Sequence, residues 1–315
     1  MKIVALAGGI GGARFLRGLR AAAPTAEITV IVNTGDDITL YGLRICPDLD
    51  TVMYTLGGGI DGERGWGRAG ETFVLKEELT AYDAPAAWFG LGDRDMATHL
   101  VRRQMMDAGY PLSAVTAALC ARWRPGMTLL PMTDDRFETH VVVDDPADDK
   151  RRAIHFQEWW VRHRAALPAH AFVSVGADTA QPAPGVVDAI AAADLAVLPP
   201  SNPVVSIGTI LQVPGIREAL SGVPLVGLSP IVGGAPVRGM ADACLAAIGV
   251  ETSAQAVGRH YAGRADGGLL DGWLVDTADA GTTVPGVRVR AVPLLMTDLA
   301  ATTAMARAAL DLADG

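Results

Sequence analysis

The sequence predicts an α/β protein of the Rossmann-like, doubly wound type, in which helices cover both faces of a mostly parallel sheet. Its strands read as short, unbroken apolar runs, which is typical of parallel strands buried on both faces. Segments with helical spacing separate these runs, and the chain opens with a strand–helix–strand unit. No internal repeat or low-complexity linker divides the 315 residues. We therefore expect one domain over residues 1–315, with a helical insertion or lid over about residues 60–165.

Composition and charge exclude several classes of protein. The formal net charge is −9 and no block of lysines or arginines occurs, so nucleic acid and anionic membranes are not expected partners. Three scattered cysteines are too few for a disulfide framework or a zinc site, and they favour a reducing, cytoplasmic compartment. No apolar run reaches the roughly 18 to 20 residues of a membrane-spanning helix. The N-terminal segment, which glycines and Arg14 interrupt, does not read as a signal peptide.

The first unit is predicted from apolar spacing and glycine content. Phe15, Leu16 and Leu19 recur at helical spacing, and apolar runs flank them on both sides. The expected elements are a buried strand at residues 2–7, a tight turn at 8–13, a helix at 14–23 and a second buried strand at 27–33.

The remaining elements follow from the same two patterns. Apolar runs predict strands at residues 128–133, 139–145, 152–156, 171–177, 195–200 and 223–231. Helical spacing predicts helices within residues 49–56, 72–82, 91–110, 111–123, 185–193, 237–250 and 297–313. Asp93 or Asp95 is expected to cap the helix within residues 91–110, and Pro111 suits the first turn of the next one.

Gly8, Gly9, Gly11 and Gly12 lie between the first strand and the first helix. Glycines in this position let backbone amides approach a phosphate at a helix N-terminus. The segment lacks the lysine and the serine or threonine of a P-loop, and it matches the dinucleotide-binding pattern only loosely. Either contact with a phosphate or close packing of the backbone would explain these glycines.

Four aspartates, Asp36, Asp37, Asp48 and Asp50, follow the second strand within fifteen residues. Asp48 could cap the helix that starts near residue 49, but a cap needs only one aspartate. Clustered carboxylates repel one another, and this cost favours a cation between them. Oxygen ligands suit Mg²⁺, which keeps several waters and adds substrate phosphates. At least one of these acids is therefore expected to bind Mg²⁺ or substrate.

Three other segments carry polar groups. Ser201, Asn202, Ser206 and Gly208 follow a strand at the carboxyl edge of the sheet, where open α/β sheets bind ligands. Residues 91–95, LGDRD, hold either a helix cap with a local ion pair or an arginine placed for a phosphate. Residues 154–160, IHFQEWW, favour a core or interface cluster over contact with reacting atoms.

Many motifs of the chain occur together and in one order: GGIGGARFL, NTGDD, PDLDTVMYTLGGGID, RGWG, GLGDRDMATHL, HFQEWWVR, PSNPVVSIG, SPIVGG and PVRGMAD. Together they closely resemble the CofD/FbiA family, the 2-phospho-L-lactate or phosphoenolpyruvate transferases of coenzyme F420 biosynthesis. The resemblance runs from residue 1 to at least residue 298. The long segments ICPDLDTVMYTLGGGID and AIHFQEWWVR resemble the actinobacterial FbiA branch in particular.

The resemblance implies a Mg²⁺-dependent phosphotransferase with a Rossmann-like fold that forms homodimers. The donor would be guanosine diphosphate bearing an enolpyruvyl or lactyl group. The acceptor would be Fo, the 7,8-didemethyl-8-hydroxy-5-deazariboflavin, whose terminal ribityl hydroxyl attacks the distal phosphorus while GMP leaves. The product would be dehydro-F420-0, or F420-0 from a lactyl donor.

The resemblance also implies roles for single residues. Asp50 matches the family's Fo-contacting aspartate and is expected to orient the acceptor, bind the metal or act as the base, with Asp48 beside it. Asp36 is the expected second metal-linked carboxylate, and Asp37 and Asp48 are the alternates. Gly90 falls near a lysine that contacts Fo in some members, so this chain offers no side chain there. The expected nucleotide and phosphate contacts are Gly8, Gly9, Gly11, Gly12, Arg14, Asp93, Arg94, Ser201, Asn202, Ser206 and Gly208.

Two other classes share parts of the pattern. YvcK-like proteins, which are nucleotide-sugar-binding regulators, share the glycine-rich start and the SNP-type loop, but they would lack the set of motifs from PDLD to HFQEWW. An NAD-dependent dehydrogenase shares the opening unit, but the glycine spacing differs and no acid–base pair for hydride transfer stands out.

Overall fold

The computed structural model describes residues 1–145 and 150–314, and its centre is a seven-stranded sheet. Every neighbouring pair of strands in this sheet is parallel, which confirms the predicted fold class. In spatial order the strands are β14 (Arg288–Ala291), β13 (Gly272–Val275), β10 (Leu225–Leu228), β9 (Leu195–Leu198), β1 (Lys2–Ala7), β2 (Glu27–Val32) and β5 (Thr128–Pro131).

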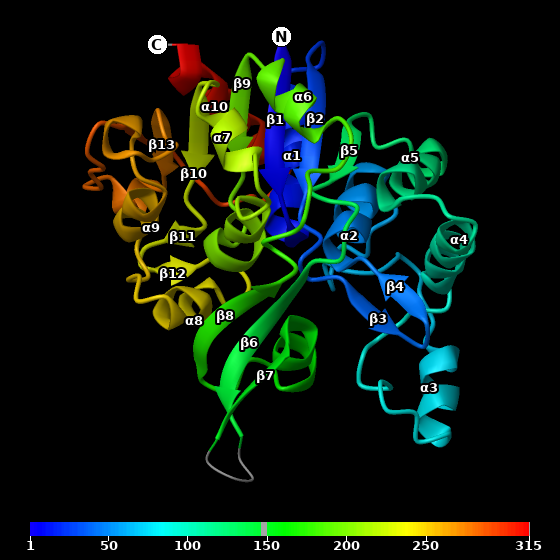
Figure 1. Cartoon of the computed structure of the whole chain (residues 1–315). Coiled ribbons are helices and arrows are strands. Elements are labelled where there is room, and N and C mark those ends of the chain that lie inside the picture. The colour runs from blue at the N-terminus through cyan, green and yellow to red at the C-terminus, as the bar shows by residue number, and fades with distance from the viewer. Residues whose placement is uncertain (146–149, 315) are drawn as a thin grey trace.

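Helices cover both faces of the sheet, as a parallel sheet requires. One buried cluster lies between the sheet and helices α1 (Gly9–Ala22), α2 (Pro47–Leu56), α5 (Leu112–Trp123) and α10 (Leu299–Asp314). A second lies between the opposite face and helices α6 (Val186–Ala191), α7 (Ile216–Leu220), α8 (Ala241–Ala247) and α9 (Ala254–Tyr261). Figure 1 shows α6 and α7 in front of the sheet and α1 and α10 behind it. Among the described residues, no helix is long and apolar enough to cross a membrane.

The order of the strands reverses at β1. The chain passes from β1 to β2 on one side, and later returns to place β9 on the other side, with Ile3 opposite Leu195. The segments that leave β1 and β9 therefore diverge at the carboxyl edge of the sheet, the lower edge in Figure 1. Such a switch point is where doubly wound sheets bind their ligands.

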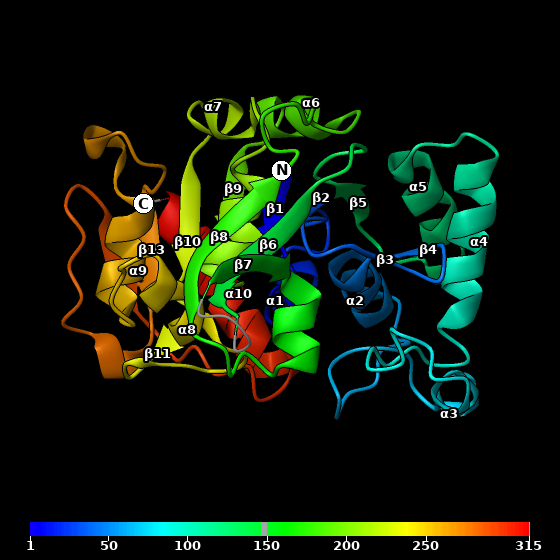
Figure 2. The same ribbon diagram turned by 60° about the horizontal axis from the view of Figure 1, so that its bottom comes forward.

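The middle third combines helices with the strands predicted at residues 128–133, 139–145 and 152–156. It contains helices α3 (Val74–Ala81), α4 (Met96–Asp107) and α5, but also strand β5 of the central sheet. It further supplies β6 (Glu138–Asp144) and β7 (Arg151–His155), which pair antiparallel in a small sheet with β8 (Ala169–Val175). This small sheet extends beyond the carboxyl edge of the central sheet in Figure 1, and Figure 2 shows it in front of that edge.

The glycine-rich segment differs from the predicted turn. Helix α1 begins at Gly9, so Gly9, Gly11 and Gly12 lie in its first turn and only Gly8 precedes it. Gly9 has a φ of +63°, a conformation that side chains with a Cβ rarely adopt. After β2, a short hairpin of β3 (Ile38–Leu40) and β4 (Leu43–Ile45) leads the acid-rich segment into α2.

Candidate active site

The switch point brings the glycine-rich helix start against the loop that follows β9. The Ser201 hydroxyl accepts a hydrogen bond of 3.2 Å from the Gly8 amide and donates one of 2.9 Å to the Gly8 carbonyl. A Cβ at Gly8 would lie 2.7 Å from the Cβ of Ser206, and a Cβ at Gly11 would lie 2.8 Å from the Pro200 carbonyl oxygen. Glycine is therefore needed here for two backbone segments to pack directly together.

The loop after β9 continues into a π-helical segment, η2 (Pro203–Gly208), which Asn202 caps. Asn202 Oδ1 accepts hydrogen bonds of 2.9 Å from the Val204 amide and 3.2 Å from the Val205 amide. Its side-chain nitrogen donates to Cys244 Sγ at 3.4 Å. The Asn202 side chain thus shapes the loop, and the backbone of η2 forms one wall of the switch point. Single π-helical turns occur often at functional sites.

Asp48 joins the first turns of α1 and α2. Its Oδ1 accepts a hydrogen bond of 2.8 Å from the Gly9 amide, and its Oδ2 accepts one of 2.9 Å from the Asn33 side chain. The free amides and the dipole of a helix N-terminus stabilise an anion. Asp48 therefore occupies a place where the sequence predicts a phosphate. Burial raises the pKa of Asp48 to about 6.

Asp36 lies beside Asp48 and is also buried. Burial, and then the negative charge of Asp48, raise the pKa of the Asp36 carboxyl well above its usual value. Asp36 Oδ1 is buried and has no hydrogen-bond partner among the described residues. Two adjacent carboxylates, one with a free buried oxygen, are an arrangement that a cation would stabilise.

The Asp36–Asp48 pair fits an open Mg²⁺ site. In residues 1–145 and 150–314, no three histidine, cysteine, aspartate or glutamate side chains converge as they do in a closed metal site. Mg²⁺ is usually held by one or two carboxylates and completes its shell with waters and substrate phosphates. Asp36 Oδ1 and the Asp48 carboxylate could supply those two protein ligands.

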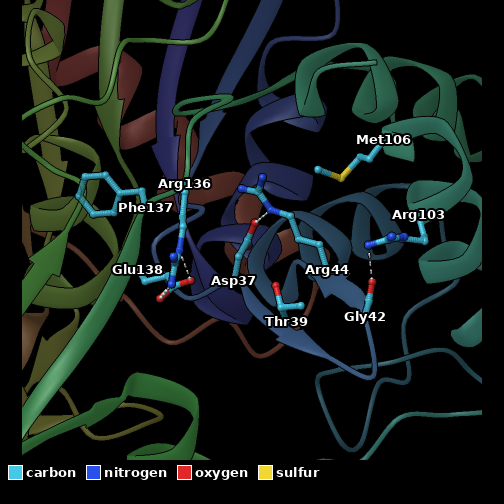
Figure 3. A pocket seen from close by; sticks show the side chains of 9 residues that line it. All are labelled: Asp37, Thr39, Gly42, Arg44, Arg103, Met106, Arg136, Phe137 and Glu138. Atoms are coloured by element: carbon cyan, nitrogen blue, oxygen red, sulfur yellow. Dashed lines mark hydrogen bonds and ion pairs between the residues drawn. The ribbon is translucent and has the colours of Figure 1, made fainter. Parts of the chain in front are cut away.

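Asp37 has a different environment. It lines a cavity of about 250 Å³, and its Oδ2 pairs with Arg44 Nε at 2.9 Å and accepts from Cys46 Sγ at 3.1 Å. Two other arginines of the cavity wall, Arg103 and Arg136, are also hydrogen-bonded to neighbours (Figure 3). Burial raises the pKa of Asp37, and the charge of Arg44 opposes that shift. The negative charge of Asp37 is therefore already balanced by the protein.

Asp50 belongs to a separate buried network. Its Oδ1 accepts a hydrogen bond from Arg102 Nη2, and His99 Nδ1 lies 3.8 Å from its Oδ2. Arg102 is fully buried and also donates to the Arg44 carbonyl at 3.2 Å. Burial raises the pKa of Asp50, and the Arg102 guanidinium opposes that shift. Asp50 Oδ2 is buried without a hydrogen-bond partner among the described residues.

A larger cavity, of about 600 Å³, lies beside the loop that follows α2. Trp66 and Phe73 line it with their ring centroids 6.2 Å apart, and the Arg64 guanidinium lies 5.4 Å and 5.3 Å from the two centroids. Gly90 contributes backbone to the wall, as its lack of a side chain implies. A flat aromatic ligand suits such a wall, because it can stack on rings and approach backbone closely.

Asp93 and Asp95 do not cap α4 as the sequence predicts. Asp93 accepts hydrogen bonds from the first two amides of α3, so it caps that helix. Asp95 accepts from the Tyr54 hydroxyl, and neither carboxylate caps α4. Arg94 is exposed, and its side chain donates to the Ala69 carbonyl at 3.5 Å. The prediction of a cap on α4 is wrong, because both carboxylates bind other segments.

His155 and Gln157 are site residues that the sequence analysis missed. His155 Nε2 lies 3.0 Å from the Asp37 carbonyl oxygen, and Gln157 Nε2 donates to the Asp36 carbonyl at 3.2 Å. Trp159 of the same segment is fully buried, as expected for the core cluster predicted at residues 154–160. The signal that could have found them is the presence of two polar side chains among the apolar and aromatic residues of IHFQEWW; His155 ends β7, and Gln157 lies in the helical turn that follows.

The fold and the site together define a Rossmann-like α/β enzyme with an acidic centre at its switch point. The chain belongs to the CofD family, because the model of that family, described as 2-phospho-L-lactate transferase CofD, matches residues 3–289. The protein is thus a transferase, which confirms the resemblance and decides against the regulatory and dehydrogenase alternatives.

Individual relatives agree with this assignment. The chain is 68% identical to proteins named phosphoenolpyruvate transferase from Streptomyces griseus and Streptomyces coelicolor, over 100% of this chain and 99% and 98% of those proteins. It is 68% identical to one from Thermobifida fusca, over 99% of this chain and 98% of that protein. A solved protein of the UPF0052 family from Bacillus halodurans has the same fold, with a TM-score of 0.60 and 18% identity over 98% of this chain and 99% of that chain.

Proposed function

We propose that this protein transfers the phosphoenolpyruvyl group, or the 2-phospholactyl group, from a guanosine-diphosphate-linked donor to the ribityl hydroxyl of Fo. The products are GMP and dehydro-F420-0, or F420-0 from a lactyl donor. The names of the relatives favour the enolpyruvyl donor. The observation that carries the proposal is the meeting of the α1 N-terminus, the loop after β9 and the Asp36–Asp48 pair at one switch point.

The donor phosphates are proposed to lie at the start of α1. An anion there meets the Gly9 amide, but Asp48 already binds that amide. A diphosphate can approach only if a cation separates it from the carboxylate, because two anions in a buried site repel strongly. We assign Asp36 and Asp48 as the Mg²⁺ ligands, in preference to Asp50, whose charge pairs with Arg102. When bound there, Mg²⁺ would neutralise charge on the donor phosphates and so favour transfer.

The acceptor is proposed to lie in the cavity lined by Trp66, Phe73 and Gly90. Its volume and aromatic wall suit the flat deazaflavin ring. Asp50 is proposed to orient the ribityl hydroxyl and take its proton at Oδ2, the carboxylate oxygen that Arg102 leaves free. Burial raises the pKa of Asp50, which makes its carboxylate a better proton acceptor at neutral pH.

Mass spectrometry of the products tests this function. Fo is incubated with enzyme, Mg²⁺ and either the enolpyruvyl or the lactyl guanylated donor, and parallel reactions contain EDTA or an adenylated donor. We expect a phosphodiester product and GMP only with a guanylated donor and Mg²⁺. Product from the adenylated donor at the same rate would contradict guanine selection, and full activity in EDTA would contradict the metal site.

A cytoplasmic homodimer is proposed from the family resemblance, and gel filtration with light scattering tests the dimer.

A further inference from the structure

Two arginines from distant parts of the chain contact the loop between α2 and α3, which spans residues 57–73. Arg14 on α1 donates from Nη2 to the Gly62 carbonyl at 3.3 Å. Arg238, between strand β12 (Ala235–Pro236) and α8, donates from Nη2 to the Arg64 carbonyl at 2.7 Å. The loop thus receives one guanidinium from the glycine-rich helix and another from the segment that follows β10.

Within residues 1–145 and 150–314, neither of these two guanidinium groups has an acidic partner. The ion pairs among the described residues include other arginines, such as Arg64 with Asp61, but none includes Arg14 or Arg238. Burial lowers the pKa of Arg14, and the positive charges of Arg238 and Arg17 lower it further. Like charges held close together without a counter-ion are stabilised when an anion binds between them.

The place of the two arginines relates them to both proposed substrates. Arg14 follows Gly9 on α1 by about one and a half helical turns, and helical side chains lean back toward the N-terminus. Arg238 binds the carbonyl of Arg64, whose own side chain lines the aromatic cavity. The loop that both arginines bind therefore adjoins the cavity proposed for the acceptor, and Arg14 belongs to the helix whose start is proposed for the donor phosphates. This places the two arginines near both proposed substrates.

We propose that Arg14 and Arg238 bind the carboxylate of the transferred group. Each guanidinium has five N–H donors and uses one on the loop, which leaves an edge for bidentate pairing with a carboxylate. Enolpyruvyl and lactyl groups both carry a carboxylate beside the ester carbon, so the two arginines select for an acid and do not distinguish these two donors. This inference rests on the proposed function and deepens it.

Calorimetry with three guanosine diphosphate ligands tests the inference. They are GDP itself, GDP esterified on its β-phosphate with lactate, and the β-ethyl ester of GDP, which lacks only the carboxylate. We expect the wild-type protein to bind the lactyl ester about tenfold or more tightly than the ethyl ester, as charge-assisted hydrogen bonds allow. In Arg238→Gln and in Arg14→Gln the two esters should bind within about twofold of each other, and Arg238→Gln should leave the affinity for GDP nearly unchanged.

Matched variants separate direct contact from other effects. Arg17→Gln removes an exposed charge from the same helix and should keep the wild-type ratio between the esters. Arg238→Lys keeps the positive charge but lacks the paired N–H donors of a guanidinium, so the ratio between the affinities for the two esters should be intermediate. An unchanged ratio in Arg238→Gln, or equal losses for all three ligands, would overturn the inference. If the wild-type protein binds none of the three ligands, the proposed function itself fails.

Discussion

The backbone amide of Gly9 donates a hydrogen bond of 2.8 Å to the carboxylate of Asp48, and this bond joins the first turns of α1 and α2. A phosphate that approaches the start of α1 therefore meets a carboxylate already in place. Either a cation between them or a proton on Asp48 relieves the repulsion. Phosphate binding, Mg²⁺ binding and protonation are thus coupled at one pair of residues.

The affinity for Mg²⁺ should fall as the pH drops through about 6. Burial raises the pKa of Asp48 to about 6, and a proton competes with the metal for the ionised carboxylate. Below that pH we expect at least about tenfold weaker binding per pH unit, because one proton is displaced from Asp48 and the pKa of Asp36 is raised as well. Titrations with Mg²⁺ in the presence of GDP, between pH 5 and 8, measure this. Asp48→Asn should bind Mg²⁺ weakly with a flatter profile, and a flat wild-type profile would contradict the assignment.

Breaking the buried pair of Asp50 and Arg102 should destabilise the fold. Asp50→Asn leaves a buried cation and Arg102→Met leaves a buried anion, and each should lower the free energy of unfolding by about 3 to 5 kcal/mol. The double variant should lose much less than the sum, which urea unfolding of all four proteins measures. Arg103→Met is the control, because Arg103 pairs with Asp107 at the surface and should lose under about 1 kcal/mol. Additive losses would show that the pair is not coupled.

Gly11→Ala should separate the two segments that meet at the switch point. The new Cβ would lie 2.8 Å from the Pro200 carbonyl oxygen, so the loop after β9 must move. We expect a loss of about 1 to 3 kcal/mol of stability and at least tenfold weaker GDP binding. Gly62→Ala is the control, because its Cβ would meet nothing within 4 Å. Unchanged GDP affinity in Gly11→Ala would argue against a donor site at this helix start.

Gln157→Leu should loosen the acid-rich loop. The substitution removes the hydrogen bond that the Gln157 side chain donates to the Asp36 carbonyl. The loss of a buried hydrogen bond costs about 1 to 3 kcal/mol of stability. We expect a higher Mg²⁺ concentration for half-maximal activity, with little change in the KM for Fo. Arg162→Gln removes an exposed ion pair of the same segment and should leave activity unchanged. If both variants change the Mg²⁺ dependence equally, Gln157 contributes only to the stability of the fold and not to the Mg²⁺ site.

Trp66→Ala should weaken binding of the acceptor. Stacking of an aromatic side chain on a flat base-like ring is worth about 1 to 3 kcal/mol, so the KM for Fo should rise by about fivefold to a hundredfold. GDP affinity should stay within about twofold, because the cavity is separate from the start of α1. Steady-state kinetics and calorimetry measure the two quantities. Tyr82→Ala, at an exposed tyrosine just beyond α3, is the control.

Much of the fold could be predicted because the first and central strands are unbroken apolar runs. The last two strands were missed for physical reasons. In β14, Arg288 and Arg290 alternate with partly buried residues, as an edge strand allows but a buried parallel strand does not. Strand β13 is only four residues long and starts with glycine, so its sequence gives little strand signal.

In the sequence analysis the four aspartates form one cluster, whereas the structure divides them between separate networks. Asp48 and Asp50 are two residues apart on α2, and residues at that spacing point to different sides of a helix. Asp48 therefore faces the start of α1, while Asp50 faces α4. The helical spacing alone implied this separation. The partner of Asp50 could not be predicted, because Arg102 is 52 residues away and reaches it only through tertiary packing.

The pairing of β1 with β9 has a consequence for how the protein is made. Ile3 lies opposite Leu195, so the first strand cannot complete its pairing until nearly two hundred residues have left the ribosome. Until then one side of β1 is open, and the nascent chain exposes an unpaired apolar strand edge. Contacts so distant in sequence also slow folding, because a long loop must close before they form. During synthesis the nascent chain is therefore at its most vulnerable to aggregation, and a chaperone that covers the free side of β1 would act in this interval.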